Sequence, residues 1–227
     1  CGESWGLLLV SGPKSAEAVA AAFGIEVRAL QLLHTLPATI GGQQGLILRT
    51  EETGEQDFEV LLPADAVPAA WNQLMTSGAP FGIKPVGAQA RELLRIEAGL
   101  PKAGPDLNEE IVPPEANLEG KAFSLSKGCY PGQEVVARMD TYGNVRRHLV
   151  GLIIQDKTVP PAGSKLFSGE REVGWVSSAV FSPQRNAALA FGFPLRDFSA
   201  PDTTLTVEVA GTRHQATVHA LPFQKHS

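Results

Sequence analysis

The chain has 227 residues, of which 43% are hydrophobic and 19% are charged, and its formal net charge is −5. This composition is typical of a globular protein with one or two domains, and the acidic balance argues against a protein that coats nucleic acid. No apolar run reaches the roughly 20 residues of a membrane-spanning helix, and no secretory signal pattern is present. Two cysteines far apart give neither a disulfide framework nor metal-ligand spacing, so we expect a reduced, cytoplasmic compartment.

The first hundred residues alternate short strands with helices. The predicted elements are strands at 5–10, 45–50 and 58–62 and helices at 16–23, 66–75 and 87–98. Ser15 and Asp65 are the expected N-caps of the first two helices, and Gly24, Gly78 and Gly99 follow the three helices as stop signals. The order of strand, helix, paired strands and helix favours an α+β domain over a doubly wound sheet.

Two stretches between these elements are less regular. Residues 25–36 alternate loosely and end at Pro37. The acidic sequence EETGEQD at 51–57 joins two predicted strands, and we expect it to be a solvated hairpin tip.

The second half of the chain has a different pattern of predicted elements. After an irregular, proline-rich stretch at 101–114, residues 122–126 (AFSLS) are predicted to form a strand, and a helix is predicted to open at Pro131. From about Arg146, six strand candidates follow, separated by Gly, Pro, Asp or Ser: HLVGLII, SKLFSG, EVGWVSSA, NAALAFGF, TLTVEVA and HQATVHAL. They predict a small antiparallel barrel, and with it domains at 1–145 and 146–227.

Residues 127–134 read KGCYPGQE and place Cys129 among turn formers instead of Val, Leu and Ile. Lys127, the start of the following helix and the flanking glycines all favour a thiolate, and Arg138 and Arg146 make the region locally basic. A thiolate there can act as a nucleophile, a metal or cluster ligand, or a redox-sensitive thiol. A small side chain packed in a tight turn is the alternative, and local composition leaves both open.

The stretch RELLRIEAG offers a second candidate residue. Glu97 follows Ile96 at the end of the predicted helix, and would lie near the domain interior if the apolar face of the helix is buried. A carboxylate there can accept two parallel hydrogen bonds from a ring with adjacent N–H groups, such as a pterin or guanine. The alternative is an ordinary Arg–Glu pair on the helix surface.

Taken together, these segments resemble a known family. KGCYPGQE is similar to K-G-C-[FY]-x-G-Q-E, the hallmark of the YgfZ group of folate-binding proteins, which are related to the aminomethyltransferase (T-protein) of the glycine cleavage system. Its defined positions are met by Lys127, Gly128, Cys129, Tyr130, Gly132, Gln133 and Glu134. Weaker matches are SGPKS near the start, TGE at 53–55, ARELLRIEAG at 90–99 and PEA at 114–116, so the resemblance covers essentially the whole chain.

The resemblance implies an α+β fold of T-protein-like folate-binding modules followed by a small antiparallel C-terminal β-barrel. It implies tetrahydrofolate, or another reduced folate, as cofactor. It also implies iron–sulfur enzymes or assembly factors as partners, without sequence-specific nucleic-acid binding or a membrane. Cys129 and Lys127 are the implied reactive residues. The implied folate-binding residues are Glu97, which corresponds to the transferases' pterin ligand, with Tyr130, Gln133, Glu134 and Arg138.

The chain departs from the family in two places. The family normally has a further segment before the strand at 5–10, which includes much of the folate-pocket wall and the transferases' catalytic aspartate. We therefore expect region 1–145 to lack its N-terminal part. Where the transferases have T-G-Y-T-G-E, this chain has TEETGE, so Glu51 and Glu52 replace a glycine and a pocket tyrosine.

The sequence leaves three functional hypotheses. The favoured one is a folate-binding accessory protein for the assembly or repair of iron–sulfur enzymes, including enzymes that modify tRNA, with Cys129 as its functional thiol. The second is an aminomethyltransferase of glycine-cleavage type, against which the cysteine motif and the missing aspartate argue. The third is a non-catalytic binding module that has lost the folate pocket.

Overall fold

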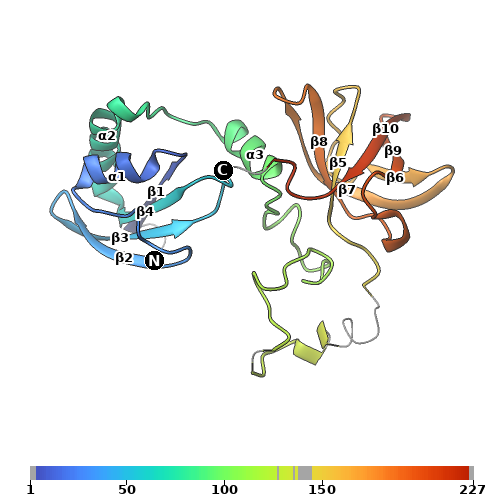
Figure 1. The fold of residues 1–227 in the computed structure, drawn as a ribbon, viewed down its shortest axis with the longest axis horizontal. Coiled ribbons are helices and arrows are strands. Elements are labelled where there is room, and N and C mark those ends of the chain that lie inside the picture. Colours follow the sequence, from blue (N-terminus) through green and yellow to red (C-terminus); the bar gives the residue numbers. More distant parts are fainter. Residues whose placement is uncertain (1–3, 127, 135, 138–144, 225–227) are drawn as a thin grey trace. The chain divides into compact units, whose positions relative to one another are not determined.

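The computed structural model describes residues 4–126, 128–134, 136–137 and 145–224. The chain forms two compact units, one up to Arg91 and the other from Glu92 onward, which we call unit 1 and unit 2 (Figure 1). The predicted domain boundary at 145/146 falls inside unit 2, because the segment that follows Glu92 is grouped with the barrel. Within the described residues, no helix is long and apolar enough to cross a membrane.

Unit 1 is a four-stranded antiparallel sheet in the order β1-β4-β3-β2, with two helices packed on one face (Figure 1). Its elements are β1 (Trp5–Ser11), α1 (Ser15–Phe23), β2 (Thr35–Ile40), β3 (Gln43–Thr50), β4 (Asp57–Pro63), η2 (Ala64–Ala66), α2 (Val67–Ser77) and η3 (Ala79–Phe81). The predicted strands at 5–10, 45–50 and 58–62 and both predicted helices of this unit are confirmed.

The alternation of β4 sets the two faces of this sheet. Phe58, Val60 and Leu62 are fully buried against the helices, where they meet Val19 of α1 and Leu74 of α2. Burial of each such side chain stabilises the fold by about 1.5–3 kcal/mol. Successive residues of a strand face opposite sides, so the residues between them lie on the other face of the sheet.

The predicted N-caps of both helices are wrong. Ser15 is the first helical residue, and its hydroxyl donates to the carbonyl of Gln56 (2.6 Å), just before β4, instead of accepting from an N–H of its own helix. Asp65 lies in η2, and the N-cap of α2 is Ala66, without a side-chain cap hydrogen bond. The predicted stop at Gly24 is confirmed, because Gly24 adopts φ 70° and donates its N–H to the carbonyl of Ala20.

Strand β2 was not predicted, because its third residue is Pro37. Among the described residues, the strand lies at the edge of the sheet and pairs only with β3. A proline lacks the N–H that a central strand needs, but an edge strand has one side without partners and tolerates it.

Unit 2 contains a closed six-stranded antiparallel barrel in the order β10-β5-β8-β7-β6-β9, which confirms the predicted C-terminal fold (Figure 1). Its elements are β5 (Val150–Ile154), β6 (Lys165–Ser168), β7 (Arg171–Ser182), β8 (Ala187–Gly192), η4 (Arg196–Phe198), β9 (Thr204–Val209) and β10 (Thr212–His219). Helix α3 (Ala88–Glu97) begins in unit 1 and its last turns belong to unit 2.

Strand β8 is buried along its whole length, because it is covered on both faces. Ala188 and Ala190 face the barrel interior, whereas Leu189 and Phe191 pack outside the barrel. The outer cluster includes Ile96 of α3, so the end of this helix is part of the hydrophobic core of unit 2.

A buried polar network ties the loop after α3 to β7. Asp106 is fully buried, and its carboxylate accepts hydrogen bonds from Ser177 (2.5 Å), Ser178 (2.7 Å), Arg95 (2.8 Å) and the backbone N–H of Lys102 (3.0 Å). Consecutive strand residues normally face opposite sides. The pairing of β7 with β8 shifts register between Val176 and Ser178, and such an irregularity lets both serines reach one carboxylate.

The segment between this network and the barrel has little regular structure. The predicted strand at 122–126 is wrong, because only an isolated bridge between Glu119 and Phe123 forms there. The predicted helix after Pro131 is described only in part. Gln133, Glu134, Val136 and Ala137 are helical, and the remainder lies outside the described residues.

Candidate functional site

The turn between β3 and β4 is organised by a buried aspartate. One carboxylate oxygen of Asp57 accepts the backbone N–H groups of Glu52 (2.6 Å) and Thr53 (2.7 Å), and the hydroxyl of Thr53 donates to the other oxygen (2.8 Å). The Thr53 hydroxyl also contacts that of Ser11 on β1 (2.7 Å). Thr53 and Asp57 are both buried, so the prediction of a solvated hairpin tip is wrong for these two residues.

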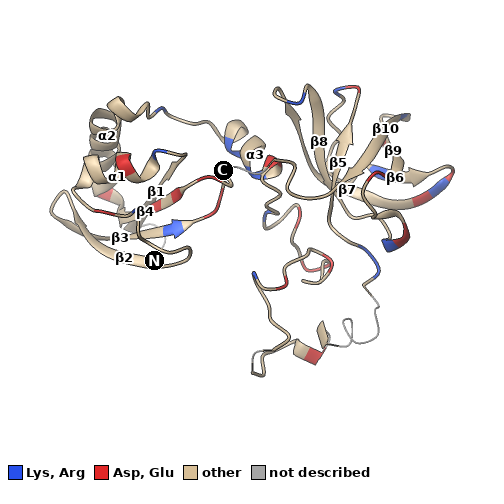
Figure 2. Cartoon of the chain, viewed as in Figure 1, with Lys and Arg blue, Asp and Glu red and all other residues tan. Residues whose placement is uncertain are grey.

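Three charged side chains gather beside this turn. Arg91 forms an ion pair with Glu52 (2.6 Å), and both side chains are about half exposed, at 54% and 42%. Glu59 of β4 lies close enough for both charges to affect it. Figure 2 shows the acidic residues concentrated where β3 and β4 are joined.

The environment of Glu59 disfavours its charged form. Burial raises the pKa of Glu59 above its ordinary value, the charge of Glu52 raises it further, Arg91 opposes the shift, and Asp57 adds to it. Within the described part of the chain, no hydrogen-bond donor to this carboxylate contributes to the shift. A carboxylate in this state gains from any ligand that brings N–H donors.

The surface around Glu59 is apolar. Glu59 pairs directly with Leu9 of β1 on one side and with Leu48 of β3 on the other, and these residues lie on the sheet face opposite the helices. Leu7 and Leu61, which pair with each other, continue the same face, and Leu7 is 52% exposed. The arrangement suits a flat heterocycle, whose faces contact leucines while its edge pairs with a carboxylate.

Sequence reasoning missed Glu59 and Arg91 as site residues. A signal was present at Glu59, because a single acidic residue interrupts the otherwise apolar strand FEVLL at 58–62. Arg91 carried no signal of its own, since it stands on a helix with several other charged residues.

The predicted pterin ligand Glu97 lies elsewhere, in unit 2. It is buried, with 5% of its surface exposed, and its carboxylate accepts a hydrogen bond from Ser182 (2.6 Å). Its backbone carbonyl accepts the N–H of Gln224 (3.0 Å). The expectation that Glu97 lies in the interior is therefore met, while its role as a ligand stays a prediction.

The described residues of the cysteine motif form a turn that leads into a helix. Cys129 is exposed and its thiol is free. Gly132 adopts φ 84°, and the N–H groups of Gln133 and Val136 bond to the carbonyls of Tyr130 (3.2 Å) and Gly132 (3.3 Å). An exposed thiol does not match the alternative of a small core side chain.

The other motif residues differ in how far they are described. Tyr130 and Gln133 are half-buried and Glu134 is exposed. Lys127 and Arg138 lie outside the described residues, so the predicted pairing of Lys127 with the Cys129 thiol stays a prediction.

Two family models match the chain. The model described as GCVT N-terminal domain matches residues 1–125, and the model described as glycine cleavage T-protein C-terminal barrel domain matches residues 147–225. The predicted membership of the wider T-protein family is thus confirmed, whereas neither model distinguishes the YgfZ group.

Proteins of similar sequence support the same family assignment. An aminomethyltransferase from Saccharopolyspora erythraea is 34% identical over 226 residues, and one from Chlorobium limicola is 34% identical over 183 residues. The alignments cover 98% and 80% of this chain but only 61% and 50% of those proteins, so the chain spans about half to three fifths of the length of these relatives.

The fold has a solved counterpart. The crystal structure of glycine cleavage system aminomethyltransferase T from Bartonella henselae superimposes with a TM-score of 0.73 at 21% identity, covering 97% of this chain and 84% of that one. Together with the four-stranded sheet, the closed barrel and the two family matches, this likeness leads to one conclusion. The chain belongs to the glycine cleavage T-protein family.

Proposed function

We propose that this chain binds a reduced folate, tetrahydrofolate or a close derivative, and that Glu59 in unit 1 holds the pterin ring. The observation that carries the proposal is the half-buried Glu59 carboxylate on a leucine-lined sheet face, with a raised pKa. The edge of a pterin presents two adjacent N–H donors, which match the two oxygens of a carboxylate. Arg91, beside it, supplies a positive charge for the carboxylates of the glutamyl tail.

Glu97 is the competing position for the pterin ring, carried over from the family resemblance. Its carboxylate already bonds to Ser182 and is almost inaccessible, so ligand binding there requires this contact to open. Glu59 needs no such rearrangement. This difference favours Glu59 and defines the experiment that separates the two.

The test is tetrahydrofolate binding by calorimetry to the chain and to three variants. Glu59→Gln keeps the size of the side chain but turns one acceptor into a donor, and we expect it to weaken binding by about tenfold to a hundredfold. Glu51→Gln, at an exposed position of the same turn, is the matched control and should bind as the parent chain does. Loss of binding in Glu97→Gln with full binding in Glu59→Gln would move the pterin to Glu97. Absence of binding to the parent chain would reject the proposal and favour a non-catalytic module.

We further propose that the folate-loaded protein supports the assembly or repair of iron–sulfur enzymes, including those that modify tRNA. The exposed thiol of Cys129 within KGCYPGQE supports this role. Measured activity of an iron–sulfur enzyme in a deletion strain tests it: the parent gene should restore the activity and Cys129→Ser should not. Full restoration by Cys129→Ser would remove the thiol from the mechanism.

Aminomethyl transfer is the second candidate function. The relatives named aminomethyltransferase, at 34% identity, favour it. Turnover of a lipoyl-bound aminomethyl group in the presence of tetrahydrofolate, undiminished by Cys129→Ser, would establish this activity in place of the iron–sulfur role.

A further inference from the structure

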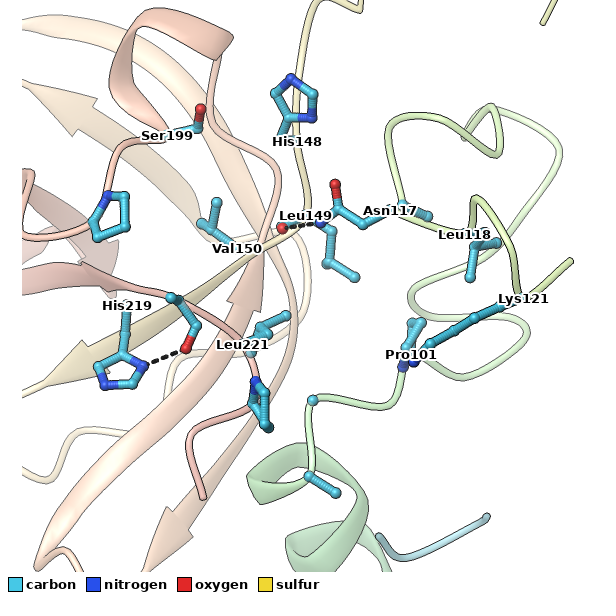
Figure 3. A pocket seen from close by; sticks show the side chains of 16 residues that line it. Pro101, Asn117, Leu118, Lys121, His148, Leu149, Val150, Ser199, His219 and Leu221 are labelled. Carbon is cyan, nitrogen blue, oxygen red and sulfur yellow. Dashed lines mark hydrogen bonds between the residues drawn. The ribbon is translucent and has the colours of Figure 1, made fainter. Parts of the chain in front are cut away.

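Unit 2 contains a cavity of about 440 Å³ that the proposed folate site does not use. Sixteen described residues line it, contributed by the segment just after α3, the turn at 116–121, the start of β5, the loop after η4 and the end of β10 (Figure 3). Ligand pockets in proteins have volumes of about 300–1,000 Å³, so this one has the size for a small metabolite.

The charged and titratable side chains on the described wall of the cavity are all basic. Among the described residues that line it, none is Asp or Glu, although the whole chain has 24 acidic residues against 19 basic ones. The charged or titratable side chains of the wall are Lys121, His148 and His219, and Ser199 adds a hydroxyl. An ammonium group on the wall of a concave site attracts anions.

Three of the polar groups on the wall are already fixed by internal bonds, and one of them is the hydroxyl of Ser199, which donates to the carbonyl of Arg196 (2.7 Å). Asn117 donates its amide N–H to the carbonyl of Leu149 (2.8 Å), and Nδ1 of His219 lies 2.5 Å from the carbonyl of Ala220 (Figure 3). With Nδ1 engaged in this way, the second ring nitrogen of His219 remains for a ligand.

The electrostatic surroundings of His148 disfavour the protonated form of its imidazole. Burial lowers the pKa of His148, the nearby Arg196 guanidinium lowers it further, and Glu115 opposes them. The imidazole is therefore neutral at neutral pH and provides one donor and one acceptor without charge. Arg196 adds a second positive charge close to the wall.

We propose that this cavity binds a small metabolite carrying a carboxylate or phosphate group, with Lys121 paired to the oxyanion. A ring N–H of His148 supplies a hydrogen bond, and Leu118, Val150 and Leu221 contact the apolar remainder of the ligand. The site is formed only by residues of unit 2, so it does not depend on the folate proposal at Glu59.

The experiment follows the imidazole resonances of His148 and His219 by NMR in the whole chain at constant ionic strength. Inorganic phosphate is titrated in one arm and glutarate in the other, and His148→Gln and His219→Gln assign the signals. We expect saturable shifts with at least one probe, and weakening by about tenfold in Lys121→Gln, because a charge-assisted hydrogen bond is lost. Lys157→Gln, an exposed lysine outside the wall, is the matched control and should leave the affinity unchanged.

The two arms identify the class of ligand. Saturation by phosphate alone assigns a phosphorylated metabolite, and saturation by glutarate alone assigns a carboxylic acid. Saturation by both supports the shared oxyanion chemistry. Linear, non-saturating shifts with both probes would overturn the proposal, and so would equal affinity in the parent chain and Lys121→Gln.

Discussion

Removal of the Asp106 carboxylate should destabilise unit 2 more than any change at its surface. In Asp106→Ala, the side chain of Arg95, which is only 7% exposed, loses its buried ionic partner. Ser177, Ser178 and the backbone N–H of Lys102 lose an acceptor at the same time. Groups buried without partners bear the full cost of desolvation.

The size of the effect follows from what remains bonded. Breaking a buried ion pair by removing one partner costs about 3–5 kcal/mol. Arg95 keeps its contacts with Glu92 and with the carbonyl of Leu100, which argues for the middle of this range. Asp106→Asn should cost less, about 2–3 kcal/mol, because its amide oxygen can face Arg95 while the serine hydroxyls rotate to accept from its NH₂ group.

The assay is chemical unfolding followed by fluorescence of Trp175 in β7, with Trp5 and Trp71 of unit 1 replaced by phenylalanine. Glu172→Ala is the control. It breaks an ion pair with Lys165 whose side chains are 52% and 57% exposed, so its loss should leave the free energy of unfolding nearly unchanged. The order should be Asp106→Ala, then Asp106→Asn, then the control. If Asp106→Ala costs no more than the control, the network contributes nothing net to stability.

Three further predictions concern single positions. Glu59→Gln should raise the melting temperature at pH 7 but not at pH 3.5. The raised pKa of Glu59 means that the folded state binds this proton more tightly than the unfolded state does. The free energy of unfolding therefore falls as pH rises past the ordinary pKa of 4.5. A variant that melts like the parent at both pH values would contradict this reasoning. Because the pKa of His148 is lowered, the free energy of unfolding should fall as pH drops through 6.5. In melts between pH 5 and 8, His148→Gln should reduce this dependence of stability on pH, and an unchanged dependence refutes the reasoning. Gly174→Ala should cost about 1–3 kcal/mol in urea unfolding, since its Cβ would lie 2.7 Å from the Cα of Pro194, whereas Gly87→Ala, with open space around it, should be neutral; equal effects contradict the steric argument.

The elements of the fold that the sequence predicts are those whose periodicity is local. All six barrel strands were found, because each is a short apolar or alternating run bounded by Gly, Pro, Asp or Ser. The strand through Pro37 was missed, since its tolerance depends on an edge position that only the sheet order reveals. Residues 122–126 alternate like a strand, yet within the described part of the chain they take part only in the isolated bridge of Phe123 with Glu119.

The candidate site was harder to predict, because it depends on positions distant in sequence. Glu52 and Arg91 are 39 positions apart and meet only when the turn after β3 lies against the start of α3. Cys129 was identified from its motif alone, and the structure adds only that its thiol is exposed. The roles of the charged residues around it depend on contacts that no local pattern encodes.

The two sheets of this protein differ in their exposure to unwanted strand pairing. The barrel closes on itself and offers no unpaired backbone edge, whereas the open sheet of unit 1 ends at β1 and β2 within the described residues. Pro37 makes β2 a poor template, because a row of hydrogen bonds cannot continue past a residue without an N–H. The leucine-rich β1 has no such interruption. Aggregation by edge-to-edge addition is therefore directed to β1, and a lysine in place of exposed Leu7 is the substitution that would most directly block it.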